Sequence, residues 1–197
     1  MEPRTIAVYE AVARQYGAAR TPVRRDAALA FGASVDGPRV DLGSGAGRYT
    51  GDLGRPVVAL DAALAMVRAS REAAPSCWPV QADLAHLPFR RGALAGAWAS
   101  MSYHHLPRAE VPLALARLHR SLAVGAPFDL TTAYGDYEGR ALPDDDFPGR
   151  WFGCWTEERL TDVLVGAGFA VEEVARRDRS LWARARRSPT LPDTVGP

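Results

Sequence analysis

A short apolar run leads straight into a glycine-rich turn at Val40-Asp41-Leu42-Gly43-Ser44-Gly45-Ala46-Gly47. We expect the run to form a buried strand and the turn to open a helix. Glycine is needed in such a turn because a Cβ atom would block both its tight backbone conformation and the close approach of a ligand. The segment therefore predicts a strand–turn–helix unit of an α/β fold.

Further apolar runs alternate with helical patterns along the chain. The expected strands cover residues 40–42, 57–60, 78–81, 94–100 and 128–132. Amphipathic or capped helices are expected at residues 5–20, 22–33, 108–122 and from Thr156 to Gly166 or Gly168. Strand–helix alternation of this kind predicts a parallel sheet with helices on both faces. Two alternating segments, 169–178 and 180–187, are expected to add an antiparallel hairpin at the sheet edge.

Size and composition favour one globular domain that acts on something small. The chain has 197 residues, of which 47% are apolar and 24% charged, and its formal net charge is +1. Such a charge gives no broad field to hold a nucleic acid. The two cysteines, Cys77 and Cys154, form no disulfide framework, and the sequence has neither a secretion signal nor an apolar run of about 18 residues. We therefore expect a cytoplasmic protein.

A carboxylate follows the second expected strand at the sequence spacing from the glycine turn that a ribose-binding acid needs. Asp61 lies 18 residues after Gly43, where an acidic side chain can accept hydrogen bonds from both hydroxyls of a ribose. The glycine turn and Asp61 together predict a nucleoside site. Arg48 stands where a dinucleotide fingerprint needs its third glycine, so NAD and FAD are disfavoured.

At these motifs the sequence resembles the class I S-adenosylmethionine-dependent methyltransferases, particularly small-molecule enzymes similar to quinone-biosynthesis methyltransferases. The resemblance covers about residues 5–187. The segment VDLGSGAGR resembles the family's first motif, and Asp61 resembles its ribose-binding acid. Gln81-Ala82-Asp83-Leu84, followed by Leu87-Pro88-Phe89, resembles the segment in which an acid reads the adenine amino group. The turn before the fifth strand departs mildly from the family, because Val124-Gly125-Ala126 replaces Pro-Gly-Gly.

The resemblance implies a Rossmann-like, seven-stranded, mostly parallel sheet of order 3-2-1-4-5-7-6. It implies one domain over residues 1–187, with a helical lid at 1–36 and a loop or cap at 134–155, followed by a disordered tail at 188–197. It also implies S-adenosyl-L-methionine as the cofactor. Its expected binding residues are Asp41, Gly43, Ser44, Gly45, Gly47, Asp61, Ala62, Met66, Asp83, Leu84, Ser100 and Tyr16.

The carboxyl end of the fourth strand is expected to deliver the catalytic groups. An activated methyl group chiefly needs an aligned acceptor, but a hydroxyl or protonated nitrogen would also need a base. His104 or His105 is best placed for that role, and the alternative is that the pair only shapes the pocket. No His, Cys and Asp cluster has metal-ligand spacing, so we expect no metal.

Three further features of the sequence allow two interpretations each. Tyr9 and Tyr16 could cover the cofactor as part of a lid, or simply pack. The aromatic segment 147–155 could select a flat or apolar acceptor, or plug the sheet edge. The run Asp144, Asp145 and Asp146 could attract a cationic acceptor, but such a run more commonly forms a solvated loop.

The sequence thus predicts methyl transfer to a small-molecule O, N or C nucleophile. The alternatives are an RNA or protein methyltransferase, and a catalytically silent protein that binds S-adenosylmethionine or S-adenosylhomocysteine. We expect a small-molecule acceptor as the partner, no membrane or nucleic acid, and a monomer or homodimer.

Overall fold

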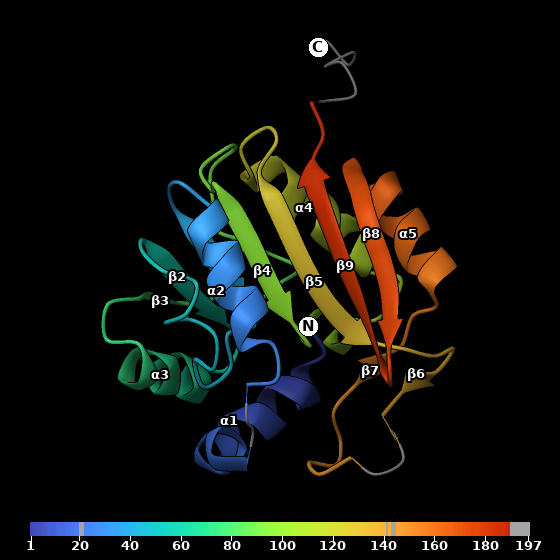
Figure 1. The fold of residues 1–197 in the computed structure, drawn as a ribbon. Helices are drawn as coiled ribbons and strands as arrows, with labels where there is room; N and C mark the ends of the chain where they lie inside the picture. The colour runs from blue at the N-terminus through green and yellow to red at the C-terminus, as the bar shows by residue number, and fades with distance from the viewer. Residues whose placement is uncertain (20–21, 141, 143–144, 190–197) are drawn as a thin grey trace, which may run out of the picture.

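The computed structural model describes residues 1–19, 22–140, 142 and 145–189. Its main element is a seven-stranded sheet of order β3-β2-β1-β4-β5-β9-β8 (Figure 1). The five parallel strands at one side of this order are β1 (Arg39–Leu42), β2 (Val57–Asp61), β3 (Trp78–Gln81), β4 (Gly96–Ser100) and β5 (Pro127–Ala133). The hairpin of β8 (Phe169–Arg177) and β9 (Ser180–Arg187) completes the sheet, with β9 antiparallel to both neighbours. The predicted order and hairpin are confirmed.

Helices lie on both faces of the sheet, as Figure 1 shows. α4 (Val111–Ser121) and α5 (Glu157–Gly166) cover one face, and α2 (Arg25–Ser34) and α3 (Leu64–Ala73) lie toward the other. α1 (Pro3–Ala19) crosses the carboxyl ends of the parallel strands, next to the short helix η1 (Tyr103–His105) and the two-residue strands β6 (Glu138–Gly139) and β7 (Phe152–Gly153). The ends of β1, β2 and β4 are thereby enclosed by other elements.

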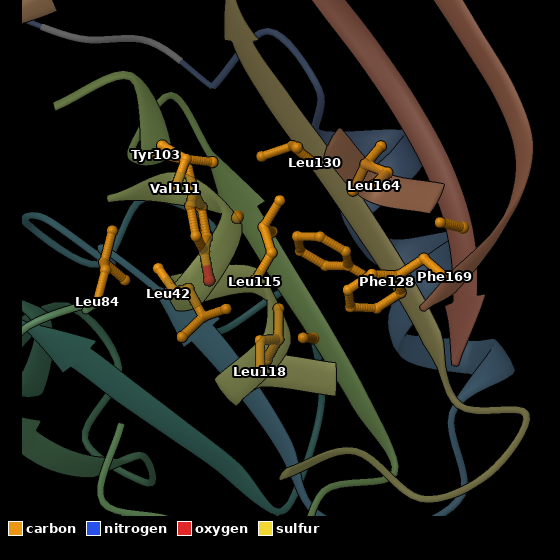
Figure 2. Close-up of a cluster of buried hydrophobic side chains, with 14 of the residues drawn as sticks. Leu42, Leu84, Tyr103, Val111, Leu115, Leu118, Phe128, Leu130, Leu164 and Phe169 are labelled. Atoms are coloured by element: carbon orange, nitrogen blue, oxygen red, sulfur yellow. The ribbon is translucent and has the colours of Figure 1, made fainter. Parts of the chain in front are cut away.

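The largest apolar cluster lies between the sheet and the helices α4 and α5 (Figure 2). Leu115 and Leu118 of α4 are buried there because residues three apart lie on the same face of a helix. Phe128 of β5 is buried there too, on one face of the sheet. A second cluster, with Phe31 and Trp98, joins α2 to the sheet. A third joins α1 to α3. The cores fix the sheet rigidly, so the loops at its carboxyl edge have a firm base.

Two predicted elements differ from the structure. Residues after the glycine turn form consecutive turns and not a regular helix, for the segment up to β2 is short and Gly54 takes a φ of +78°. Helix α2 begins at Arg25 and not at Pro22, and Thr21 lies outside the described residues. The expected tail reaches residues 190–197, which also lie outside them. Among the described residues, no helix combines the length and apolar character needed to cross a membrane.

Candidate active site

The glycine turn packs so closely that side chains are excluded at two of its positions. Gly43 has a φ of +68°, and a Cβ atom there would lie 2.4 Å from the Cβ of Ser102. Gly47 has a φ of +80°, and its Cβ atom would lie 2.8 Å from the Cα of Ser70 in α3. The backbone of the turn is fixed against β2, because the Gly43 N–H donates to the carbonyl of Leu60 at 2.8 Å. This confirms the physical reason given for glycine in the motif.

A cleft of about 710 Å³ opens over this turn and runs beneath α1. It lies at the carboxyl ends of the strands, where ligands bind in open α/β sheets. Eight of the twelve expected cofactor residues line it, namely Asp41, Gly43, Ser44, Gly45, Gly47, Asp61, Ser100 and Tyr16. The sequence motifs therefore converge on one cavity.

The other four expected residues do not line the cleft. Met66 is fully buried against Ala13 of α1, and Leu84 belongs to the main core. Ala62 is buried beside Asp61. Asp83 pairs with the amino group of Met1, and Met1 itself lines the cleft. Asp83 is thus separated from the cavity by one residue, and the adenine-reading role expected of it stays a prediction.

Two carboxylates in the cleft have raised pKa values. The oxygens of Asp61 accept hydrogen bonds from the N–H groups of Gly45 and Ala63, both at 2.9 Å. Burial nevertheless raises the pKa of Asp61 to about 6. Burial also raises the pKa of Asp41 to about 7, although the hydroxyl of Thr50 donates a 2.7 Å hydrogen bond to this carboxylate, which by itself lowers the pKa. Each Asp61 oxygen keeps a further lone pair with which to accept a ligand hydroxyl.

Two buried hydroxyls in the cleft have no hydrogen-bond partner within the described residues. They are the Oγ atoms of Ser44 and Ser102, and both residues line the cavity. A buried polar atom without a partner is costly, so a polar ligand that reaches these hydroxyls would be favoured. Together with the glycine turn and Asp61, they fit a polar nucleoside ligand.

The two histidines predicted as candidate bases lie at different depths. His105 lines the cleft but is only 3% exposed, and His104 does not line the cleft and stacks on Phe152. Burial lowers the pKa of His105 to about 4, and burial together with the neighbouring His105 lowers that of His104 well below its usual value. Both rings are therefore neutral at pH 7.

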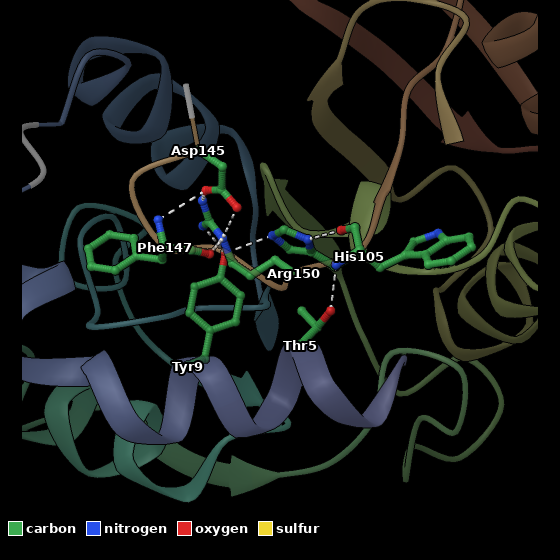
Figure 3. A network of polar contacts seen from close by, with 7 residues as sticks. Thr5, Tyr9, His105, Asp145, Phe147 and Arg150 are labelled. Atoms are coloured by element: carbon green, nitrogen blue, oxygen red, sulfur yellow. Dashed lines mark hydrogen bonds and ion pairs between the residues drawn. The ribbon is translucent and has the colours of Figure 1, made fainter. Parts of the chain in front are cut away.

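Both ring nitrogens of His105 are engaged (Figure 3). Nδ1 lies 2.6 Å from the carbonyl oxygen of Trp151, and Nε2 lies 2.7 Å from the hydroxyl of Tyr9. A carbonyl can only accept, so Nδ1 carries the hydrogen of the neutral ring and Nε2 accepts from Tyr9. The hydroxyl of Tyr9 in turn accepts from Nη1 of Arg150 at 2.8 Å.

Of the two interpretations of the acidic run, the solvated loop is wrong at Asp145. Its side chain is 5% exposed and pairs with Arg150, which is itself buried and also donates from Nε to the carbonyl of Phe147 at 3.2 Å. Asp144 lies outside the described residues. Sequence reasoning missed Arg150 as a site residue, although its place in an aromatic segment five residues after Asp145 was a weak signal.

Helix α1 is joined to the 145–152 segment by more than the tyrosine. The N–H of Trp151 donates to the hydroxyl of Thr5 at 2.7 Å, and Arg140 pairs with Glu2 at 2.7 Å. Thr5 and Tyr9 lie in the first half of α1, and Figure 3 shows both side chains directed toward the 145–152 segment. This is the arrangement expected of a lid and a cap, whose functional roles stay a prediction.

Comparisons with known proteins agree with these motifs. Residues 40–125 match the family model described as Methyltransferase domain. No curated protein matches the sequence. The family match confirms the predicted enzyme class, a methyltransferase, and with it S-adenosylmethionine as the cofactor.

Solved structures share the fold at low sequence identity. The structure of the DhpI–SAH complex has a TM-score of 0.76 at 21% identity, covering 96% of this chain and 100% of that chain. The Burkholderia thailandensis 1,6-didemethyltoxoflavin-N1-methyltransferase, solved with bound 1,6-didemethyltoxoflavin and S-adenosylhomocysteine, has a TM-score of 0.71 at 22% identity, covering 92% of this chain and 88% of that chain. A chain from the complex of the Haloferax volcanii Trm112 methyltransferase activator with a methyltransferase gives 0.78 at 17%, covering 94% and 98%. These likenesses confirm the Rossmann-like fold.

Proposed function

We propose that this chain, which carries a methyltransferase domain, transfers a methyl group from S-adenosylmethionine to an O, N or C nucleophile of a small molecule. The observation that carries the proposal is that the glycine turn, Asp61 and two serine hydroxyls without a partner among the described residues meet in one cleft of about 710 Å³ beneath α1. When bound, the cofactor supplies an electrophilic methyl group. The chain itself then needs to position an acceptor and keep water away.

Several of the expected cofactor residues have a proposed task. Asp61 would accept hydrogen bonds from the ribose hydroxyls, and the turn at 43–47 would leave room for the adenosyl group. Asp41 would favour the positively charged end of the cofactor. Asp83, with the backbone of Leu84, would recognise the adenine amino group, and this needs Asp83 to exchange its contact with the amino group of Met1.

Several features support a small acceptor. The cleft is covered by α1 and lies beside the aromatic 145–152 segment, and the formal net charge is only +1. The Burkholderia thailandensis neighbour was solved with bound 1,6-didemethyltoxoflavin. We propose in addition a cytoplasmic location and a monomer or homodimer. The neighbour from the Trm112 complex favours a second candidate, an RNA or protein methyltransferase that works with an activator.

The first test is binding of the cofactor product. We expect S-adenosylhomocysteine to bind in the micromolar range by calorimetry, and Asp61→Ala to weaken it at least about tenfold, which corresponds to about 1.4 kcal/mol. Asp36→Ala is the matched control, because Asp36 is exposed and does not line the cleft. Absence of binding by the unaltered protein would refute the proposal, as would equal effects of the two substitutions.

The second test identifies the class of acceptor. The protein is incubated with S-adenosylmethionine labelled in its methyl group and with three separate acceptor pools: small metabolite extract, total RNA and total protein. We expect label to enter the small-molecule fraction. Label that enters only RNA or protein would replace the leading proposal by the second candidate. Strong product binding with no transfer to any pool would favour a silent binding protein.

A further inference from the structure

Tyr9, Arg150 and His105 form one hydrogen-bonded chain at the edge of the cleft, and it has a fixed direction. Arg150 can only donate, so its 2.8 Å contact makes the Tyr9 oxygen an acceptor. The carbonyl of Trp151 can only accept, which places the hydrogen of neutral His105 on Nδ1 and leaves Nε2 as an acceptor at 2.7 Å from Tyr9. The Tyr9 hydroxyl hydrogen therefore points at His105.

This arrangement leaves His105 without a free ring nitrogen for an acceptor molecule. Both of its nitrogens are engaged and its ring is 3% exposed. Tyr9 is partly exposed and lines the cleft. Its hydroxyl oxygen has two lone pairs and one hydrogen, of which Arg150 and His105 take one lone pair and the hydrogen. One lone pair remains to accept a hydrogen bond from an incoming group.

We propose that Tyr9 is the catalytic residue that takes the proton from the methyl acceptor, with His105 and Arg150 as positioning residues, and that the acceptor is accordingly an O–H or N–H compound. The proposal rests on the methyl-transfer function proposed above. In this proposal His105, the base expected from the sequence, receives the proton through Tyr9 and does not contact the acceptor. The range of acceptors narrows from any O, N or C nucleophile to one that carries an O–H or N–H group.

The proton transfer balances without any further reactant. Tyr9 Oη receives the acceptor's proton as its own proton passes to Nε2 of His105. The electron pair freed on the acceptor forms the new bond to the methyl carbon, while the bond from that carbon to the cofactor's sulfur breaks and leaves its electron pair on sulfur. The positive charge lost at sulfur reappears on the imidazolium of His105, and the Trp151 carbonyl stabilises this ion through Nδ1.

The charges around Tyr9 suit this transfer. Arg150 lies against the Tyr9 oxygen, so its guanidinium stabilises negative charge that develops there while the proton moves. Asp145 neutralises Arg150 and keeps it fixed, and both side chains are buried. Burial and the nearby Arg150 lower the pKa of His105 to about 4, so the ring is neutral at pH 7 and holds the proton only while the methyl group is transferred. It also releases that proton readily afterwards.

The rival explanation is that Tyr9 only fastens α1 to the loop. Two substitutions separate these roles. Tyr9→Phe removes the hydroxyl from the relay. Thr5→Val removes a different hydrogen bond between α1 and the 145–152 segment, at Trp151 N–H, and leaves the side chains of Tyr9, His105 and Arg150 unchanged. Circular dichroism and affinity for S-adenosylhomocysteine show whether each variant is folded and binds.

The activity arm uses labelled S-adenosylmethionine with phenol and indole derivatives as protic acceptors, and with N,N-dimethylaniline and benzoate as acceptors that need no base. We expect label in the protic set only. Tyr9→Phe should lower kcat at least about 100-fold, in the range typical of a lost acid–base group, with product affinity changed less than about threefold. Thr5→Val should lose far less. Equal losses in the two variants, or equal transfer to dimethylaniline, would overturn the proposal.

A second arm needs no acceptor at all. Nitrogen-15 NMR of the imidazole ring reads the tautomer of His105 directly, and we expect Nδ1 protonated, Nε2 unprotonated, and a changed Nε2 shift in Tyr9→Phe. A proton on Nε2 in the unaltered protein would reverse the chain and refute the relay even if methyl transfer is observed. Failure of product binding in the unaltered protein would instead refute the proposed function, so the two failures are distinguishable.

Discussion

The residue that links binding to pH most directly is Asp61, because its carboxylate accepts hydrogen bonds from a ribose in the function we propose. Its pKa is raised by burial to about 6, and that of Asp41 to about 7. A protonated carboxyl has lost accepting capacity, so protons compete with the cofactor. Affinity must therefore decrease as the pH falls through these values, and not as it rises.

We predict that the dissociation constant for S-adenosylhomocysteine levels off toward pH 8 and rises about fivefold from pH 6 to pH 5, as expected for one carboxylate, Asp61, with a pKa of about 6. Calorimetry between pH 5 and 8 checks this. Asp61→Asn should bind more weakly and lose most of the dependence below pH 6, whereas Asp36→Ala should retain it. An affinity that is independent of pH in the unaltered protein would contradict the assignment of Asp61.

Some residues of the site could be predicted from the sequence and others could not, for a physical reason. The glycine turn and Asp61 each follow a buried strand, so their places depend on local pattern and on the sheet alone. The pair of Asp145 and Arg150 lies in an aperiodic segment. Its burial comes from contact with α1, more than a hundred residues away, and composition alone suggested a solvated loop.

At the scale of elements, helix α2 is attached to the sheet by Arg24 at its N-terminal end. The guanidinium lies 4.5 Å from the ring centre of Trp98 and 4.3 Å from that of Trp182, and it pairs with Asp129 of β5 at 2.7 Å. This tertiary pairing explains why α2 begins at Arg25 and not at the proline that the sequence suggested. The buried ion pair of Arg24, and not the local capping signal in the sequence, sets where this helix begins.

We predict that Arg24→Ala lowers the free energy of unfolding by about 3–5 kcal/mol, because it leaves Asp129 buried without its partner. Urea unfolding monitored by tryptophan fluorescence measures this. The double variant Arg24→Met with Asp129→Leu should recover most of the loss. Arg184→Ala is the control, since its pair with Glu173 is largely exposed and is worth less than about 1 kcal/mol. A small loss in Arg24→Ala would contradict the anchoring role.

The order of strands was predictable because alternation and handedness leave few topologies. The turns after Gly47 were not, although the motif resembles one that opens a helix. Arg39 donates to the carbonyls of Leu53 and Arg55, at 2.9 and 3.1 Å, and so holds the end of this segment against β1. Arg39 lies in the preceding strand, β1, and a local sequence pattern cannot show that it contacts this segment.

At the scale of the whole molecule, α1 lines the cleft and contacts the 145–152 segment, although neither belongs to the seven-stranded sheet. α1 contributes Tyr9, Ala13 and Tyr16 to the cavity lining, and it contacts the loop through Thr5 and Tyr9. A ligand that binds beneath α1 would order it, and the shared hydrogen bonds would pass that order to the loop. Lid and cap are then one cooperative unit.

We predict that S-adenosylhomocysteine slows amide hydrogen exchange at least about tenfold in both α1 and residues 145–152, a local stabilisation of about 1.4 kcal/mol, and leaves α5 unchanged. Exchange followed by mass spectrometry resolves the three segments. In Thr5→Val the slowing should persist in α1 but shrink in the loop, because the hydrogen bond to Trp151 N–H is lost while the ligand still contacts the helix. Slowing confined to α1 in the unaltered protein would show that the two segments respond independently, and the loop would then not close with the helix.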